Sequence, residues 1–111
     1  MEKNRISFLS IEYERKYLDM IRCMTLRIFQ GHDCTIFLFG SRAEGKFQRG
    51  SDYDIGVSGL DEPTFFRLKA RLSDEVEESL IPYKADVVNF DKVSEDFKNI
   101  ALRNTVLWKR N

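Results

Sequence analysis

The sequence has few of the residues that form metal centres or disulfide frameworks. It contains one histidine, two cysteines and two prolines among 111 residues. His32 has no second histidine near it, so a zinc site is not expected. Cys23 and Cys34 form no C-x-x-C motif, and we expect them to be reduced, partly buried thiols.

The sequence also lacks net charge and long apolar runs. Eighteen Lys and Arg residues balance eighteen Asp and Glu residues, which excludes a broadly basic protein that binds nucleic acid directly. No apolar run approaches the roughly 20 residues that cross a bilayer. No signal-peptide stretch follows the N-terminus. We therefore expect a cytoplasmic protein that does not contact a membrane.

What is present suits one small folded unit. Hydrophobic residues make up 42% of the chain and include nine phenylalanines, enough for one core. No repeat, linker or low-complexity segment interrupts the pattern. A single domain over residues 1–111 is expected.

Two elements are predicted before the first glycine-rich loop. A helix is expected over residues 7–30, because apolar side chains recur at three- and four-residue steps and so share one face. These side chains, which we expect to pack in the core, are Tyr13, Tyr17, Met20, Ile21, Met24 and Ile28. Gly31 is the expected left-handed stop. A β-branched and aromatic run at 35–39 then predicts a buried strand.

The remaining elements alternate. A loop at 40–51 opens with one helical turn, a strand follows at 53–58, and Pro63 begins a helix. The expected buried stripe of that helix is Phe65, Leu68, Leu72, Val76 and Leu80. A strand at 83–90, a short helix from the Ser94 cap through 103 and a strand at 105–108 complete the chain. The order predicts an α/β (α+β) fold with a small mixed β-sheet flanked by helices.

The loop after the first strand has the features of an anion-binding turn. Gly40 and Ser41 lead into a helical start, where backbone N–H groups without internal partners attract anions. Glycine lets a phosphate approach closely, and the Ser41 hydroxyl adds a donor. Three basic residues and one acidic residue give this loop a local charge of +2; they are Arg42, Lys46, Arg49 and Glu44. The charge suits a polyphosphate, which we expect Arg42 to contact.

Three aspartates follow in strand-like contexts. Asp52 and Asp54 are two residues apart, so their side chains point to the same face of a strand. Asp86 lies within an apolar run, where it must be hydrogen-bonded, metal-bound or at an exposed strand end. If the strands at 53–58 and 83–90 are neighbours, the three carboxylates converge. Mg²⁺ favours such oxygens together with water and substrate phosphates, and the set suits two-metal phosphoryl chemistry.

These motifs resemble a known family. Gly40-Ser41, ten intervening residues and Asp52-x-Asp54 reproduce the G-S-x10-D-x-D signature of the DNA polymerase β-like nucleotidyltransferases. The fuller pattern, G-S-R-A-x-G at 40–45 and S-D-x-D at 51–54, is similar to the minimal nucleotidyltransferases, known as MNT. The resemblance covers about residues 33–111. It implies a polymerase β-like palm core over that range, after the less diagnostic N-terminal helix.

The resemblance also implies roles for individual residues. Gly40 and Ser41 would contact the triphosphate of ATP or another nucleotide. Asp52 and Asp54 would hold two Mg²⁺ ions, and Asp86 would complete the ion that activates the acceptor hydroxyl. The three aspartates would thus be both catalytic residues and metal ligands.

The implied partner is a protein. Larger family members carry a second domain for the acceptor, and no such segment follows residue 111 here, which suggests that a partner supplies that surface. Minimal nucleotidyltransferases typically pair with a small all-helical HEPN protein, often an RNase toxin. In such pairs the MNT chain is the antitoxin and in some cases transfers AMP from ATP to a tyrosine of its partner. A homo- or hetero-oligomer is compatible with this arrangement.

Two other functions remain open from the sequence. The chain is a non-catalytic binding module if it neutralises a HEPN partner by occlusion alone. It is a small-molecule nucleotidyltransferase, acting for example on an aminoglycoside, if a dimer or partner builds the acceptor pocket. No residue of the sequence identifies the preferred base of the nucleotide.

Overall fold

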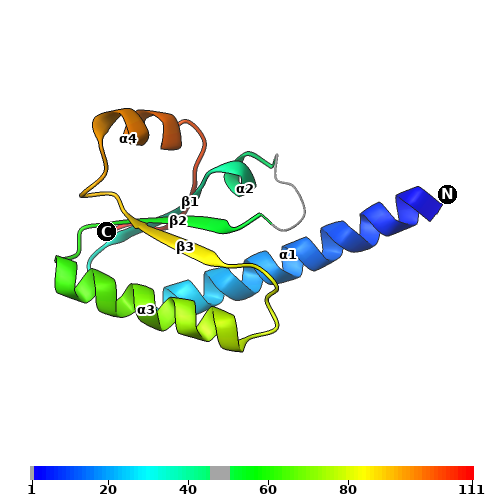
Figure 1. The fold of residues 1–111 in the computed structure, drawn as a ribbon, viewed down its shortest axis with the longest axis horizontal. Coiled ribbons are helices and arrows are strands. Elements are labelled where there is room, and N and C mark those ends of the chain that lie inside the picture. The colour runs from blue at the N-terminus through cyan, green and yellow to red at the C-terminus, as the bar shows by residue number, and fades with distance from the viewer. Residues whose placement is uncertain (1, 46–50) are drawn as a thin grey trace.

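The computed structural model describes residues 2–45 and 51–111, with side chains from residue 12 onward. Helices and strands follow in the order α1 (Glu2–Ile28), β1 (Thr35–Phe39), α2 (Ser41–Glu44), β2 (Tyr53–Ser58), α3 (Glu62–Glu78), β3 (Ala85–Asn89), α4 (Glu95–Ala101) and β4 (Val106–Lys109) (Figure 1). Each element lies where the sequence predicts it, with ends that differ by a few residues.

The four strands form one mixed sheet in the order β3-β2-β1-β4. β1 runs antiparallel to β2 and β4, whereas β2 and β3 are parallel and are joined through α3. The register pairs Asp54 of β2 with Asp86 of β3. The predicted small mixed sheet flanked by helices is therefore confirmed.

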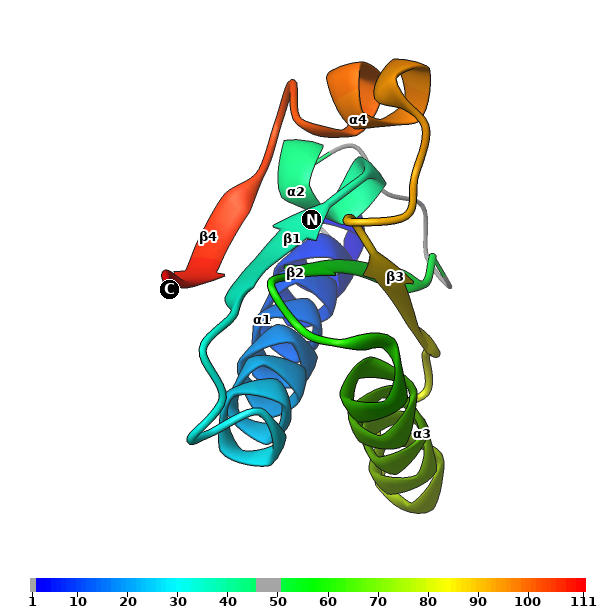
Figure 2. The same cartoon turned by 90° about the vertical axis from the view of Figure 1, so that its left-hand side faces the viewer.

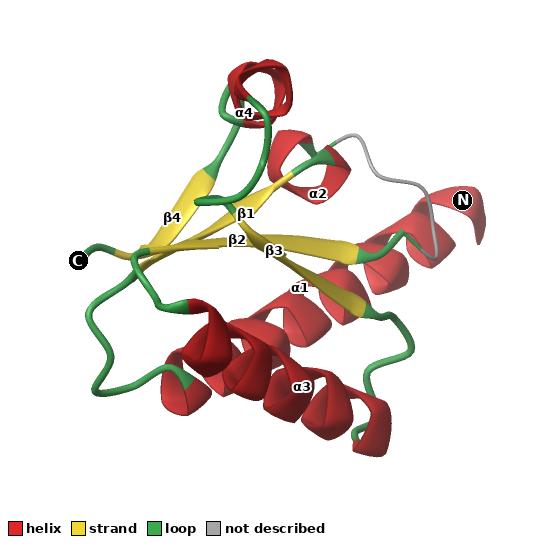
Figure 3. Cartoon of the chain, turned by 60° about the vertical axis from the view of Figure 1, so that its left-hand side comes forward, coloured by secondary structure: helices red, strands yellow, loops and turns green. Residues whose placement is uncertain are grey.

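The main core lies between the sheet and two helices. α1 and α3 lie side by side against one face of the sheet, and α2 and α4 lie on the opposite side (Figures 2 and 3). Tyr53, Ile55 and Val57 alternate along β2 and are fully buried in this core. Because strand side chains alternate, Asp54 is directed to the opposite face, the side of α4.

A small aromatic cluster covers part of that second face. The rings of Phe37 and Phe39 lie 4.7 and 5.0 Å from the ring of Phe90, in edge-on geometry. Gly56 lies beneath them, where an added Cβ would stand 2.4 Å from Cζ of Phe37. Phe97 of α4 packs on the cluster, with its ring 6.0 Å from that of Phe39. The cluster thus fixes α4 over the face that carries the aspartates.

The local signals act largely as expected. Gly31 adopts φ +85° after α1, the left-handed conformation predicted for a helix stop. The predicted cap Ser94 accepts a hydrogen bond from the Phe97 N–H at the start of α4. At the start of α3, Asp61, which was not predicted as a cap, accepts one from the Thr64 N–H. These caps define the two helices that flank β3.

Three burial predictions are wrong. Leu80 is 84% exposed, because α3 ends at Glu78 and Ile81 takes the buried place instead. Tyr13 is 56% exposed, since the N-terminal part of α1 extends beyond the sheet (Figure 1). Cys23 is exposed, whereas Cys34 is buried as expected. In the described part of the chain, no helix has the length and apolar character needed to cross a bilayer.

Candidate active site

The sheet brings the three predicted aspartates to one edge of the molecule. Asp54 and Asp86 stand opposite each other on neighbouring parallel strands, and Asp52 precedes Asp54 by two residues. Asp54 is half-buried, whereas Asp52 and Asp86 are exposed. The sequence offered three explanations for an aspartate within an apolar run: a hydrogen bond, a bound metal or an exposed strand position. Asp86 is exposed on β3, the strand at the edge of the sheet.

The electrostatics of Asp54 are unfavourable without a cation. Burial raises the pKa of the Asp54 carboxyl, and the negative charges of Asp86 and Asp52 raise it further, while the positive charge of Arg42 opposes the shift. Within residues 12–45 and 51–111, none of the three carboxylates has a hydrogen-bond or ion-pair partner. Uncompensated carboxylates gathered in this way are a donor set that suits a divalent cation.

The three carboxylates do not form a closed cage. Among the described side chains, no three His, Cys, Asp or Glu residues are grouped closely enough to hold a metal ion on their own. Mg²⁺ commonly takes only one or two protein carboxylates and completes its coordination with water and substrate phosphates. The arrangement therefore fits an ion that is bound together with a nucleotide.

The raised pKa of Asp54 leads to a stability prediction. A carboxyl whose pKa is higher in the folded than in the unfolded state destabilises the fold above that pKa, and the penalty disappears as the pH falls through it. In EDTA at pH 7, we expect Asp54→Asn to raise the melting temperature by about 2–5 °C. The increase should shrink on acidification in a thermal-unfolding series. An equal or lower melting temperature for the variant at pH 7 would contradict this account.

The Gly40-Ser41 turn lies directly against this carboxylate. Gly40 has φ +76°, which favours glycine, and an added Cβ would stand 2.4 Å from Oδ2 of Asp54. The backbone N–H groups of Ala43 and Glu44 donate to the Gly40 carbonyl, which closes α2 into a single turn. The predicted nucleotide-binding turn and the predicted metal-binding carboxylate are thus immediate neighbours.

The Arg42 side chain is buried against groups other than the three aspartates. It is 4% exposed, and its guanidinium donates to the Ser51 carbonyl at 2.6 and 2.8 Å and to the Glu14 carboxylate at 2.6 Å. The group lies over the rings of Tyr53 and Tyr83, at 4.2 and 4.5 Å from their centroids. Tyr53 belongs to the core on the opposite face of β2 from Asp54.

Arg42 therefore joins the N-terminal helix to the start of β2. The hydroxyl of Tyr83 donates to the second oxygen of Glu14, so one carboxylate of α1 serves both groups. Burial raises the pKa of Tyr53 to about 12, so its phenol stays neutral beside this ion pair. We call Glu14, Arg42, Ser51, Tyr53 and Tyr83 the arginine clamp. It fixes the residue that immediately precedes Asp52.

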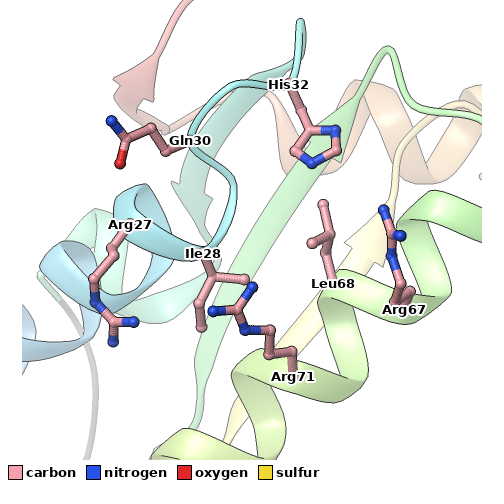
Figure 4. Close-up of a pocket in the computed structure, with 7 residues that line it drawn as sticks. All are labelled: Arg27, Ile28, Gln30, His32, Arg67, Leu68 and Arg71. Atoms are coloured by element: carbon pink, nitrogen blue, oxygen red, sulfur yellow. The ribbon is translucent and has the colours of Figure 1, made fainter.

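The other predicted basic residues of the loop, Lys46 and Arg49, lie outside the described residues. A separate basic hollow of about 400 Å³ lies between the end of α1 and α3 (Figure 4). Its basic side chains are Arg27, His32, Arg67 and Arg71. Arg27 is paired with Glu75. This hollow adjoins the start of β1, whereas Gly40 and Asp54 lie at the end of β1, a strand length away.

Sequence reasoning missed the partners of Arg42. Glu14 stands three residues before Tyr17, on the same helix face as the predicted apolar stripe. A carboxylate such as Glu14 on an otherwise apolar helix face indicates that a cationic side chain is buried against it. Nothing in the local sequence indicated that the cation is Arg42, because the two residues are 28 positions apart.

The comparison with known families matches most of the chain. Residues 28–111 match the family described as Polymerase beta, Nucleotidyltransferase. A curated relative from Haemophilus influenzae, named probable protein adenylyltransferase MntA, is 30% identical over 94 residues. The match covers 85% of this chain and 80% of the relative.

Three solved structures share the fold. A toxin-antitoxin crystal structure with AMP-PNP aligns with TM-score 0.62 and 20% identity, over 81% of this chain and 73% of that chain. A tri-AMPylated Shewanella oneidensis HEPN toxin in complex with MNT antitoxin aligns with TM-score 0.60 and 16% identity, over 84% and 72%. A mutant MntA-HpeT toxin-antitoxin, with two aspartates two positions apart replaced by glutamate, aligns with TM-score 0.57 and 21% identity, over 78% and 68%.

Proposed function

The chain belongs to the polymerase beta nucleotidyltransferase family, and on that premise we propose that it transfers AMP from ATP to a hydroxyl of a partner protein. The observation that carries the proposal is the contact between two predicted parts of the site. Gly40 packs against the Asp54 carboxylate, and Asp54 stands opposite Asp86. A triphosphate at the turn would thus lie beside the carboxylates.

The described residues divide the work between nucleotide and metal. Gly40 and Ser41 bind the triphosphate through the turn that begins α2. Asp52, Asp54 and Asp86 would hold Mg²⁺, since Asp54 stands opposite Asp86, and the charges of Asp86 and Asp52 act on the Asp54 carboxyl. When bound, two such ions neutralise the triphosphate charge and lower the pKa of the acceptor hydroxyl.

The transfer itself is a substitution at the α-phosphorus of ATP. The acceptor oxygen forms a bond to the α-phosphorus while the bond from that phosphorus to the bridging oxygen breaks. Pyrophosphate leaves with the bonding electron pair, and the proton of the hydroxyl passes to a carboxylate, a role that we assign to Asp86 because it is exposed on β3 opposite Asp54. The product is an AMP phosphodiester on the partner.

The proposed partner is a HEPN toxin, with this chain as its MNT antitoxin. The proposal is supported by the relative named as a probable protein adenylyltransferase and by the fold shared with an MNT antitoxin that accompanies an AMPylated HEPN toxin. The alternative functions raised by the sequence, occlusion without chemistry and transfer to a small molecule, have no specific observation in their favour.

The choice of labelled phosphate tests the reaction class. When the chain is incubated with its proposed HEPN partner protein and Mg²⁺, we expect label to pass to that protein from α-³²P-ATP. No label should pass from γ-³²P-ATP, because the γ-phosphate leaves in pyrophosphate. EDTA should stop the transfer, and added Mg²⁺ should restore it. Transfer of the γ-label would show phosphoryl transfer and refute the assignment.

A further inference from the structure

A groove leads away from Asp86 along the open edge of the sheet. Its volume is about 390 Å³, and α3 and the segment after β3 form its walls. The lining includes Phe65, Phe66, Lys69, Asp86, Val88 and Lys92. Asp86 is the one predicted catalytic residue that lines it, so the groove is continuous with the candidate active site.

The floor of the groove is an edge strand. β3 stands at the end of the strand order and, among residues 2–45 and 51–111, pairs with β2 alone. An edge strand presents N–H and C=O groups that an added chain segment can pair with. Phe66 of α3 borders this edge and is 59% exposed, which is uncommon for a large aromatic side chain. The groove thus combines unpaired backbone with apolar surface.

We propose that this groove binds the hydroxyl-bearing segment of the partner protein as an added strand on β3. The proposal rests on the proposed function and specifies where its acceptor docks. An added strand would lie about 4.8 Å from β3. A residue opposite Asp86 on the same face would have its Cβ about 4.5–5.5 Å away. A tyrosine or serine there would direct its hydroxyl towards Asp86 and Asp54.

The groove carries charges of both signs. Glu62, Lys69, Asp86 and Lys92 line it, and Lys92 is paired with the exposed Glu62 at 3.3 Å. Asp86 lies near the start of β3 and Lys92 follows its end. The occupant we infer is therefore an extended segment of the partner protein with its hydroxyl residue at the Asp86 end of the groove.

Photo-crosslinking tests the groove without relying on catalysis. Phe66 is replaced by p-benzoylphenylalanine in the full chain, which is mixed with the proposed HEPN partner protein. The same replacement at Leu80, 84% exposed beyond the end of α3, is the matched control. A third replacement at Ile100, 63% exposed on α4, samples another apolar surface. We expect at least tenfold more crosslinking from position 66, to a segment that contains a hydroxyl residue.

A second pair of variants connects the groove to transfer. Phe66→Asp should reduce AMP transfer to the partner at least tenfold with unchanged affinity for AMP-PNP, whereas Leu80→Asp should transfer normally. Crosslinking only from Ile100, or from Phe66 to a second copy of this chain, would overturn the groove. If position 66 crosslinks to the partner but the wild type transfers no label, the proposed function fails and the docking site stands.

Discussion

Replacing Asp52 and Asp54 together by asparagine is expected to reduce AMP transfer at least 10³-fold. Asparagine keeps the shape of each side chain but removes the two charges that would hold Mg²⁺ on the triphosphate. Asp54 also lies against Gly40, so an uncharged amide there changes the electrostatics of the turn without adding a non-hydrogen atom. The measurement is transfer of α-³²P-AMP to the HEPN partner, quantified per mole of chain.

The control for this double variant is Asp91→Asn. Asp91 accepts a hydrogen bond from the Gly59 N–H, at the opposite end of β2 from Asp54. The Asp91→Asn variant should therefore leave transfer unchanged. Size-exclusion chromatography of each variant with the partner shows whether the complex still forms. If the double variant labels the partner as well as the wild type, the catalytic assignment is wrong. If it transfers nothing yet fully rescues growth from the toxin, neutralisation occurs by occlusion.

Arg42→Ala is expected to cost about 3–5 kcal/mol in the free energy of unfolding. The substitution leaves the Glu14 carboxylate, which is 16% exposed, and the Ser51 carbonyl without the guanidinium that pairs with both. It also removes the cation between the rings of Tyr53 and Tyr83. Urea unfolding followed by circular dichroism measures the loss. Because domains of this kind have about 5–15 kcal/mol in total, a large fraction is at stake.

Two further variants make this prediction specific. Arg42→Lys keeps the charge but loses the planar fork, and should fall between wild type and Arg42→Ala. Arg27→Ala removes the exposed partner of Glu75 and should hardly move the urea midpoint, since exposed ion pairs contribute little. An unchanged midpoint for Arg42→Ala would show that the arginine clamp does not hold the fold.

The same variants separate a structural role of Arg42 from a contact with nucleotide. If Arg42 contacts the triphosphate, as its charge predicted, Arg42→Lys should raise KM for ATP while the stability stays near that of the wild type. If Arg42 acts through the arginine clamp, the stability of Arg42→Lys should fall below that of the wild type. Glu14→Gln should then reproduce much of this loss, although Glu14 lies on α1, far along the chain from the turn.

The local sequence determined most of the secondary structure. The alternation in Tyr53–Ser58, the Ser94 cap and the left-handed Gly31 act within a few residues, so their effects can be predicted without the fold. Leu80 shows the limit of such reasoning, since a helical pattern does not reveal where the helix ends. The apolar periodicity of α3 continues to Leu80 in the sequence, but the helix ends at Glu78.

The sequence also determined which residue types the candidate site contains, because the spacing from Gly40 to Asp54 joins a turn to the neighbouring strand. Only the tertiary structure decided that Asp86 stands in register with Asp54 on a parallel strand, since that pairing depends on the crossover through α3. It also decided that Arg42 is buried against Glu14. A charge has no fixed partner in sequence, and burial in a packed core selects the partner that neutralises it.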